Sequence, residues 1–196
     1  MNTGTDYQEI ISYARGEFRD YAPVLIEHSN GTQEITFAKK GCNYNFFNFI
    51  LSKQYIFVTG DICEAIYKFP EPIRIQNIDD TYNLHMLNSN LIATKNNLQY
   101  FDNEIAFYSI KENLENLGCV NFDSKECVSL LEAAKSCCSI SEWVRDLFAI
   151  EGLDSLDKYW YRWLPNIGTR LNTDYVLCWI ALRTCHNILC EKSDNV

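Results

Sequence analysis

The hydrophobic positions in the first third of the chain mostly alternate, as they do in β-strands. EITFA, at 34–38, alternates after an Asn30-Gly31 turn and predicts a strand. NFFNFIL and YIFVTG flank the short polar break 52–54, which predicts a hairpin. EAIYKF then predicts a further strand that two prolines end. These segments predict a small antiparallel sheet.

A helix is expected before this sheet. Thr5-x-x-Gln8 matches a capping box, and apolar residues recur at helical spacing after it. The helix is expected over 6–20, ended by Pro23. Residues 1–75 are therefore predicted to form one helix and the antiparallel sheet.

After the prolines, the period of the pattern becomes helical. A helix is expected to start at Asp79 or Asp80, and another over 102–118 closes on a glycine. The helix after Asp123 carries one apolar face, on which we place Cys127, Leu130, Leu131, Ala134 and Cys138. Three further helical segments are predicted. The capping box Ser139-x-x-Glu142 starts one, and Leu153, Leu156, Trp160 and Trp163 recur at three- and four-residue steps in the next. The last is an apolar helix over 172–190. Residues 76–196 are therefore expected to be helical and to share one core with the sheet, which makes the fold class α+β.

The nine cysteines are expected to be reduced and mostly buried. Their number is odd, and a chain of 196 residues needs no disulfides for stability. Cys178, Cys185, His186 and Cys190 lie close in sequence, but they lack metal-ligand spacing, so neither a metal nor a cofactor is expected. The chain opens without a secretory signal and contains no apolar run long enough to span a membrane, which predicts a cytoplasmic protein.

Most of the negative charge is concentrated in one stretch. The net charge is −9, and residues 102–157 contain 12 acidic side chains but only four basic ones. Direct binding of nucleic acid is not expected, because neutralising phosphates requires clustered Lys and Arg. An acidic surface favours a basic partner, although it also serves solubility. The acidic residues that we expect to contact a partner are Glu112, Glu115, Asp123, Glu126 and Glu132.

The aromatic run YWYRWLP, at 159–165, is a second candidate for contact with a partner. Trp, Tyr and Arg are enriched among the residues that dominate binding energy at interfaces. Helical spacing places Trp160 and Trp163 toward the core and leaves Tyr161 and Arg162 nearer solvent. Tyr161 and Arg162 are therefore the expected contact residues.

The turn Thr59-Gly60-Asp61 raises the question of whether it binds an anion or a metal. A phosphate loop needs several glycines and usually a lysine, and only Gly60 is present. A structural turn is therefore the favoured interpretation. The alternative is a small hydrolase that uses Asp61, Glu64 and a histidine, for which the chain offers His28, His85 and His186.

This same turn carries a resemblance. Residues 57–67, FVTGDICEAIY, resemble a strand–TGD–(E)A-(I/V)-(Y/F) pattern of uncharacterised accessory proteins from phages and mobile elements of low-GC Gram-positive bacteria. The resemblance implies a phage-type protein acting in the bacterial cytoplasm, a class that includes anti-CRISPR inhibitors. Together with the acidic stretch 102–157, it leads to the hypothesis of a non-enzymatic inhibitor whose acidic helical surface binds a host defence nuclease, such as a CRISPR effector ribonucleoprotein. An oligomeric regulatory phage protein is a further alternative.

Overall fold

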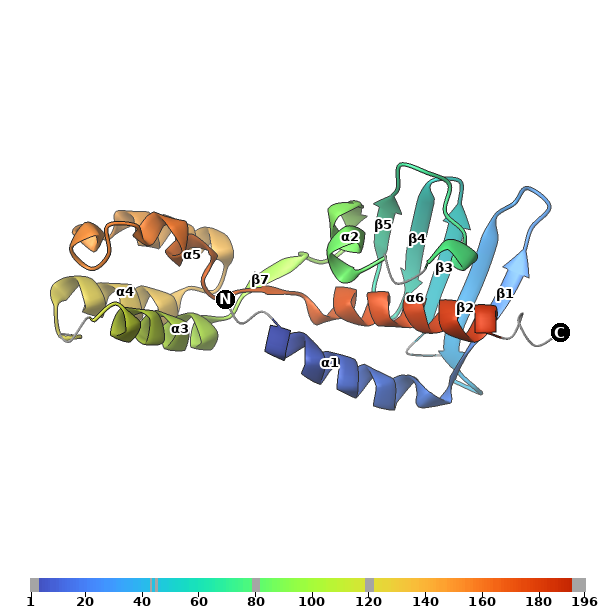
Figure 1. The fold of residues 1–196 in the computed structure, drawn as a ribbon, viewed down its shortest axis with the longest axis horizontal. Helices are drawn as coiled ribbons and strands as arrows, with labels where there is room; N and C mark the ends of the chain where they lie inside the picture. The colour runs from blue at the N-terminus through green and yellow to red at the C-terminus, as the bar shows by residue number, and fades with distance from the viewer. Residues whose placement is uncertain (1–3, 43, 45, 79–81, 119–121, 192–196) are drawn as a thin grey trace. The chain divides into compact units, whose positions relative to one another are not determined.

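The computed structural model describes residues 4–42, 44, 46–78, 82–118 and 122–191. It confirms the α+β class, with a six-stranded antiparallel sheet in the N-terminal half and helices in the C-terminal half (Figure 1). The chain divides into two compact units, which we describe separately. The sheet unit comprises Met1–Leu98 and Asn172–Val196, and the helical unit comprises Gln99–Leu171.

This division differs from the boundary expected near residue 75. Helix α6 (Thr173–Glu191), expected in the helical part, belongs to the sheet unit. Most of its central residues are buried, and it packs against α1 and the first three strands. A helix that is apolar nearly all round must be covered on most sides, and in this protein the sheet and α1 provide that cover.

The sheet is a simple antiparallel meander in which each strand pairs with the next along the chain. The strands predicted at 34–38 and 55–60 are confirmed, and those predicted at 45–51 and 64–69 are observed at 47–52 and 65–68. The pattern missed the first and last strands of the sheet. The strands are β1 (Tyr21–Glu27), β2 (Gln33–Lys39), β3 (Phe47–Ser52), β4 (Tyr55–Gly60), β5 (Ala65–Lys68) and β6 (Leu91–Thr94).

Pro23 explains why the first strand was missed. It was expected to follow the helix as a breaker, but it lies inside β1 and pairs with Phe37 of β2. Proline cannot donate a ladder hydrogen bond, so it is tolerated in a strand mainly at the edge of a sheet. β1 is such an edge strand, since β2 is its only neighbour in the sheet.

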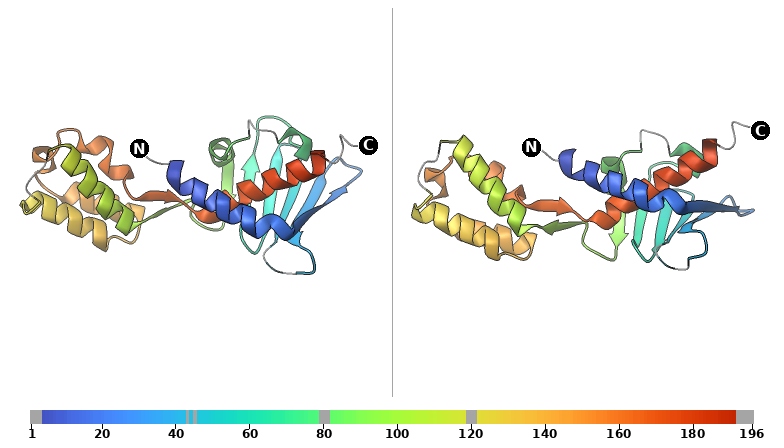
Figure 2. Two further views of the ribbon diagram at one scale, coloured as in Figure 1. Left: turned by 60° about the horizontal axis from the view of Figure 1, so that its bottom comes forward. Right: turned by 90° about the horizontal axis from the view of Figure 1, so that it is seen from below.

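One face of the sheet forms the core of the sheet unit. In β2, β3 and β4, every second residue is buried, as a half-covered strand requires. Helices α1 (Gly4–Glu17) and α6 lie along this face (Figures 1 and 2). The turn η1 (Phe18–Asp20) after α1 places Phe18 edge-on against Phe37 and Phe47. The predicted first helix is thus confirmed, while the side chains of its capping box lie outside the described residues.

Along the chain, two short elements lie between β5 and β6 within the sheet unit, η2 (Ile75–Asn77) and α2 (Leu84–Ser89). Asn83 caps α2 by accepting a hydrogen bond from the backbone N–H of Met86. The helix expected near residue 79 therefore starts later; Asp79 and Asp80 themselves lie outside the described residues. Strand β6 follows α2, in a segment where the sequence predicted no strand.

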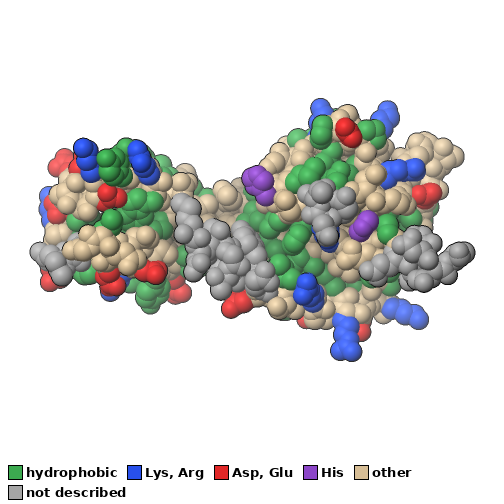
Figure 3. All heavy atoms as spheres, in the orientation of Figure 1, with side chains coloured by type: hydrophobic (Ala, Val, Ile, Leu, Met, Phe, Trp, Pro, Cys, Tyr) green, Lys and Arg blue, Asp and Glu red, His purple; other side chains and the backbone are tan. Residues whose placement is uncertain are grey.

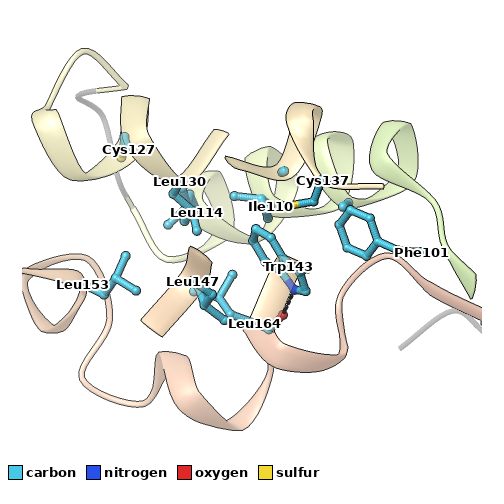
Figure 4. Packing of buried hydrophobic residues seen from close by; sticks show 12 residues of the cluster. Phe101, Ile110, Leu114, Cys127, Leu130, Cys137, Trp143, Leu147, Leu153 and Leu164 are labelled. Atoms are coloured by element: carbon cyan, nitrogen blue, oxygen red, sulfur yellow. Dashed lines mark hydrogen bonds between the residues drawn. The ribbon is translucent and has the colours of Figure 1, made fainter. Parts of the chain in front are cut away.

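The helical unit has its own buried cluster, centred on Trp143 (Figure 4). The Trp143 ring stacks on Phe101 at 5.5 Å, and its Nε1–H donates to the Leu164 carbonyl at 2.9 Å. The elements around this cluster are the two-stranded antiparallel sheet of β7 (Gln99–Phe101) and β8 (Thr169–Leu171), the helices α3 (Asn103–Asn116), α4 (Lys125–Ser136) and α5 (Ile140–Ala149), and the 3₁₀ turns η3 (Leu153–Ser155), η4 (Trp160–Arg162) and η5 (Leu164–Asn166).

The three helices of this unit begin where the sequence predicted. Asp102, Ser124 and Ser139 each accept a hydrogen bond from a first-turn backbone N–H. Two details differ from expectation. Cys138 is exposed, because α4 ends at Ser136, and the segment 153–163 forms separate 3₁₀ turns instead of a continuous helix.

Candidate protein-interaction surface

The predicted acidic residues all lie in the helical unit, on α3, on α4 and in the loop between them. On α3, the buried residues Ala106, Ile110 and Leu114 define the core-facing side, so Glu112 and Glu115 point away from it. Both are exposed, as is Glu132 on the outer side of α4. Asp123 is exposed just before α4.

Glu126 differs from the other four acidic residues. It is partly buried at the start of α4, against the turn that follows α5. A Cβ added to Gly152 in this turn would lie 3.2 Å from the Glu126 Cγ. Glu126 therefore takes part in packing, and its negative charge in the first turn also favours the helix dipole.

Three of the exposed glutamates have no basic partner among the described side chains. Within the described residues, no Lys, Arg or His side chain lies within ion-pair distance of Glu112, Glu115 or Glu132. The nearby bases are engaged elsewhere: Arg145 pairs with Asp146 at 2.7 Å. The charge of these glutamates is thus available to a partner.

The acidic surface is interrupted by a basic seam between α3 and α4, made of Phe107, Lys111, Phe122 and Lys135. The Lys135 ammonium lies 4.1 Å from the Phe107 ring centroid, and Lys111 lies between the Phe107 and Phe122 rings at 5.6 and 5.7 Å. Figure 3 shows the same mixture, since acidic, basic and apolar side chains are interspersed on the visible face of this unit. The acidic side chains are therefore confined to the outer faces of α3 and α4 and do not cover the whole surface of the unit.

The second predicted contact region forms a compact aromatic surface, made of Phe148, Tyr159, Trp160, Tyr161 and Arg162. Phe148 meets Trp160 edge to face at 5.3 Å, and Trp160 meets Tyr161 at 6.3 Å. The Arg162 guanidinium lies 4.7 Å from the Tyr159 ring centroid and 5.8 Å from that of Tyr161. Phe148 is 62% exposed, Tyr159 48% and Tyr161 51%, so this cluster faces solvent.

Two aspartates hold the aromatic surface in place. Trp160 Nε1–H donates to Asp154 at 3.0 Å, and Trp163 Nε1–H donates to Asp157 at 2.7 Å. Asp157 also accepts from the backbone N–H of Tyr159 at 2.9 Å. Trp160 and Trp163 are partly buried against the core, as predicted, while Tyr161 and Arg162 are exposed. The tryptophans thus fix the turn that presents Tyr161 and Arg162.

Phe148 is the member of this surface that the sequence did not identify. The apolar stripe of α5 contains Trp143 and Leu147, and both are buried. Phe148 follows Leu147 and falls outside this stripe. The sequence could have indicated Phe148 as a contact residue, because it is a large apolar residue on the polar side of an amphipathic helix.

The Thr59-Gly60-Asp61 turn has a structural reason for its glycine. Gly60 has φ +140°, and a Cβ there would clash with the carbonyl oxygen of Phe46. Close backbone approach therefore requires glycine, which supports the structural interpretation of the turn. Glu64 pairs with Lys95 at 2.8 Å, and His28 and His186 are bonded to Glu34 and to the Ile75 carbonyl. These two histidines are thus engaged away from Glu64.

Cysteines are mostly buried thiols, as predicted. Five of the eight described cysteines are buried, namely Cys63, Cys127, Cys137, Cys178 and Cys185. Burial, reinforced by Asp146, raises the pKa of Cys137 to about 11, and burial also raises that of Cys185. Among the residues with described positions, no group of three or more His, Cys, Asp or Glu is arranged to hold a metal ion.

Comparisons with protein-family models, with curated proteins and with solved structures found no match. Across the described ranges, none of the helices combines the length and apolar character needed to cross a membrane.

Proposed function

We propose that the protein is a non-enzymatic interaction protein that binds a partner protein through its helical unit. The observation that carries this proposal is the exposed aromatic surface, in which Arg162 stacks on two tyrosines. A large exposed apolar cluster costs solubility, and interface hot spots are enriched in Tyr, Trp and Arg. The hydrogen bonds of Trp160 and Trp163 to aspartates hold the cluster in one geometry before binding, which lowers the entropy cost of association.

The acidic residues suggest the charge of this partner. Glu112, Glu115 and Glu132 are exposed and carry no ion pair within the described part of the chain. Complementary charge accelerates association and selects among partners. We therefore propose a basic protein as the partner.

The resemblance of residues 57–67 to phage accessory proteins supports a narrower proposal. On this basis the partner is a bacterial defence nuclease, and the protein acts as an anti-CRISPR-like inhibitor in the bacterial cytoplasm. A nucleic-acid groove is basic because it neutralises phosphates, so an acidic surface competes for it directly.

Affinity purification with matched baits tests the proposal. The baits are the wild-type protein, Tyr161→Ala in the aromatic surface, and Tyr13→Ala in the sheet unit as the control. Tyr13 is 60% exposed and lies on α1, so its truncation removes a similar exposed ring elsewhere. We expect a basic nucleic-acid-binding protein to be retained by the wild type and by Tyr13→Ala, and lost with Tyr161→Ala. Equal retention by all three folded baits would contradict the proposal.

A further inference from the structure

The sheet has a second face, which carries a row of side chains that are all apolar except Glu34. Strand register places Ile26, Glu34, Ile50, Phe57, Ile66 and Ala93 side by side, one from each of the six strands. In β2, β3, β4 and β5 the neighbours of these residues along the strand are buried, so the row points to the opposite side of the sheet, which we call the outer face.

The outer face is exposed in the single chain. Val24 and Ile26 are 59% and 50% exposed, and Ile50, Phe57 and Ile66 remain partly accessible. α1 and α6 lie on the other side of the sheet (Figure 2). Tyr55 and Phe57 stack on each other at 5.8 Å along β4, which adds an aromatic strip to the row. An apolar area of this extent on a soluble domain indicates an interaction surface.

The charges on this face favour a second copy of the same chain as the occupant. The strands carry only two charged side chains on it, Glu34 and Lys68, so its net charge is zero. The whole chain carries −9, so two copies repel each other over most of their surface. They approach with least repulsion through a face that has no net charge.

Symmetry then brings the two charges on the outer face together. When two sheets pack face to face around a two-fold axis parallel to the strands, β1 lies over β6 of the second copy, β2 over β5, and β3 over β4. Glu34 is on β2, and Lys68 is on β5, two residues beyond the row member Ile66. In this arrangement, Ile26 faces Ala93 and Ile50 faces Phe57 of the second copy. Glu34, which pairs with His28 in its own chain, faces Ile66, so that Lys68 of the second copy lies two residues further along the same strand.

Association through the strand edge is less favourable. Pro23 lies in the middle of the edge strand β1 and removes a backbone donor. A strand added at this edge would lose one ladder hydrogen bond, whereas packing through the face leaves the backbone unchanged. We propose that the outer face is the interface of a two-fold symmetric dimer. This proposal does not depend on the function proposed for the helical unit.

Sedimentation velocity of the full chain over a wide concentration series tests the dimer. We expect a reversible dimer for the wild type and for Val128→Lys, a control that places a new charge at a partly exposed apolar position of the helical unit. Phe57→Lys is expected to be monomeric at every concentration. A wild type that stays monomeric throughout, or a Phe57→Lys variant that still dimerises, would overturn the proposal.

A charge exchange tests the symmetry without disturbing the apolar row. Glu34→Lys and Lys68→Glu should each weaken self-association by about tenfold, because each change places like charges in two symmetry-related contacts. The double variant Glu34→Lys/Lys68→Glu should recover most of the wild-type affinity. Circular dichroism and thermal unfolding establish that each variant is folded. If the folded double variant associates no better than the single variants, the two-fold arrangement is wrong.

Discussion

Replacing Gly60 by alanine should destabilise the sheet unit much more than the same change at Gly31. Gly60 closes β4 opposite Phe47 and has φ +140°. Gly31, in the turn between β1 and β2, also has a positive φ, of +81°, but no atom lies within 4 Å of the position that its Cβ would occupy. Both substitutions therefore force alanine into an unfavourable backbone conformation, and only Gly60→Ala also creates a steric clash.

The expected size follows from these two contributions. A non-glycine residue in the left-handed region costs about 1 kcal/mol, which is the expected loss for Gly31→Ala. The backbone of Gly60 lies in a region that is nearly exclusive to glycine, which costs about 1–3 kcal/mol. The clash with the Phe46 carbonyl involves backbone on both sides, so relieving it costs about 1–3 kcal/mol more. We expect Gly60→Ala to lower the free energy of unfolding by about 2–6 kcal/mol, the sum of these two contributions.

Urea denaturation followed by far-ultraviolet circular dichroism measures the two free energies. Because the chain has two compact units, hydrogen exchange of the peptides that cover β3 and β4 assigns the loss to the sheet. Equal unfolding free energies for the two variants would refute the steric argument. If Gly60→Ala kept wild-type stability but lost partner binding, the turn would be a functional site.

Three further predictions concern the helical unit and the thiols. With a thiol reagent at neutral pH, the exposed Cys138 should react fast and the buried cysteines only after denaturation; rapid labelling of most cysteines in the native protein would contradict their placement. Trp143→Phe should cost the helical unit about 2–3 kcal/mol in urea denaturation, because it removes the indole hydrogen bond to the Leu164 carbonyl and opens a cavity, and a loss below 1 kcal/mol would count against this. Ser139→Ala should cost about 1 kcal/mol by removing the cap of α5, whereas Ser139→Asp, which can still accept the N–H of Glu142, should retain most of the stability.

Much of the fold could be predicted because the hydrophobic period of a strand or helix and the capping residues of a helix are local properties of the sequence. The strand at 34–38 alternates strictly, the segment 55–60 is an apolar run that ends at Gly60, and Ser139 and Glu142 mark the start of α5 in the sequence itself. The edge strand β1 was missed because Pro23 normally ends regular structure, and only its position at the edge of the sheet makes it acceptable. The division of the chain was not predictable either, because α6 returns to the sheet from far along the sequence.

For the candidate surface, the sequence indicated residue types better than their arrangement. The composition of 159–165 pointed to Tyr161 and Arg162, and the structure places both at the surface. Neither the contact between Phe148 and Trp160 nor the stacking of Arg162 on Tyr159 has a periodic signal, since both depend on how the 3₁₀ turns pack on α5. Glu126 looked equivalent to its acidic neighbours until its packing against Gly152 was visible.

The central claim is that the helical unit binds a basic partner through local charge and aromatic contacts. It is tested by comparing two charge-reversal variants of equal net charge. The first reverses Glu112, Glu115 and Glu132 to lysine on the helical unit, and the second reverses Glu9, Glu17 and Glu71 to lysine on the sheet unit. All six glutamates are exposed, and each triple reversal changes the charge by +6, from −9 to −3.

The deciding measurement is the affinity of each variant, by surface plasmon resonance, for the protein retained in the affinity purification. Exposed charge pairs contribute about 0.2–1 kcal/mol each, so the helical-unit variant should bind about tenfold more weakly than the wild type. Most of the loss should lie in the association rate, and added salt should reduce it. The sheet-unit variant should bind nearly as well as the wild type. Equal affinities of the two folded variants for this partner would contradict the account.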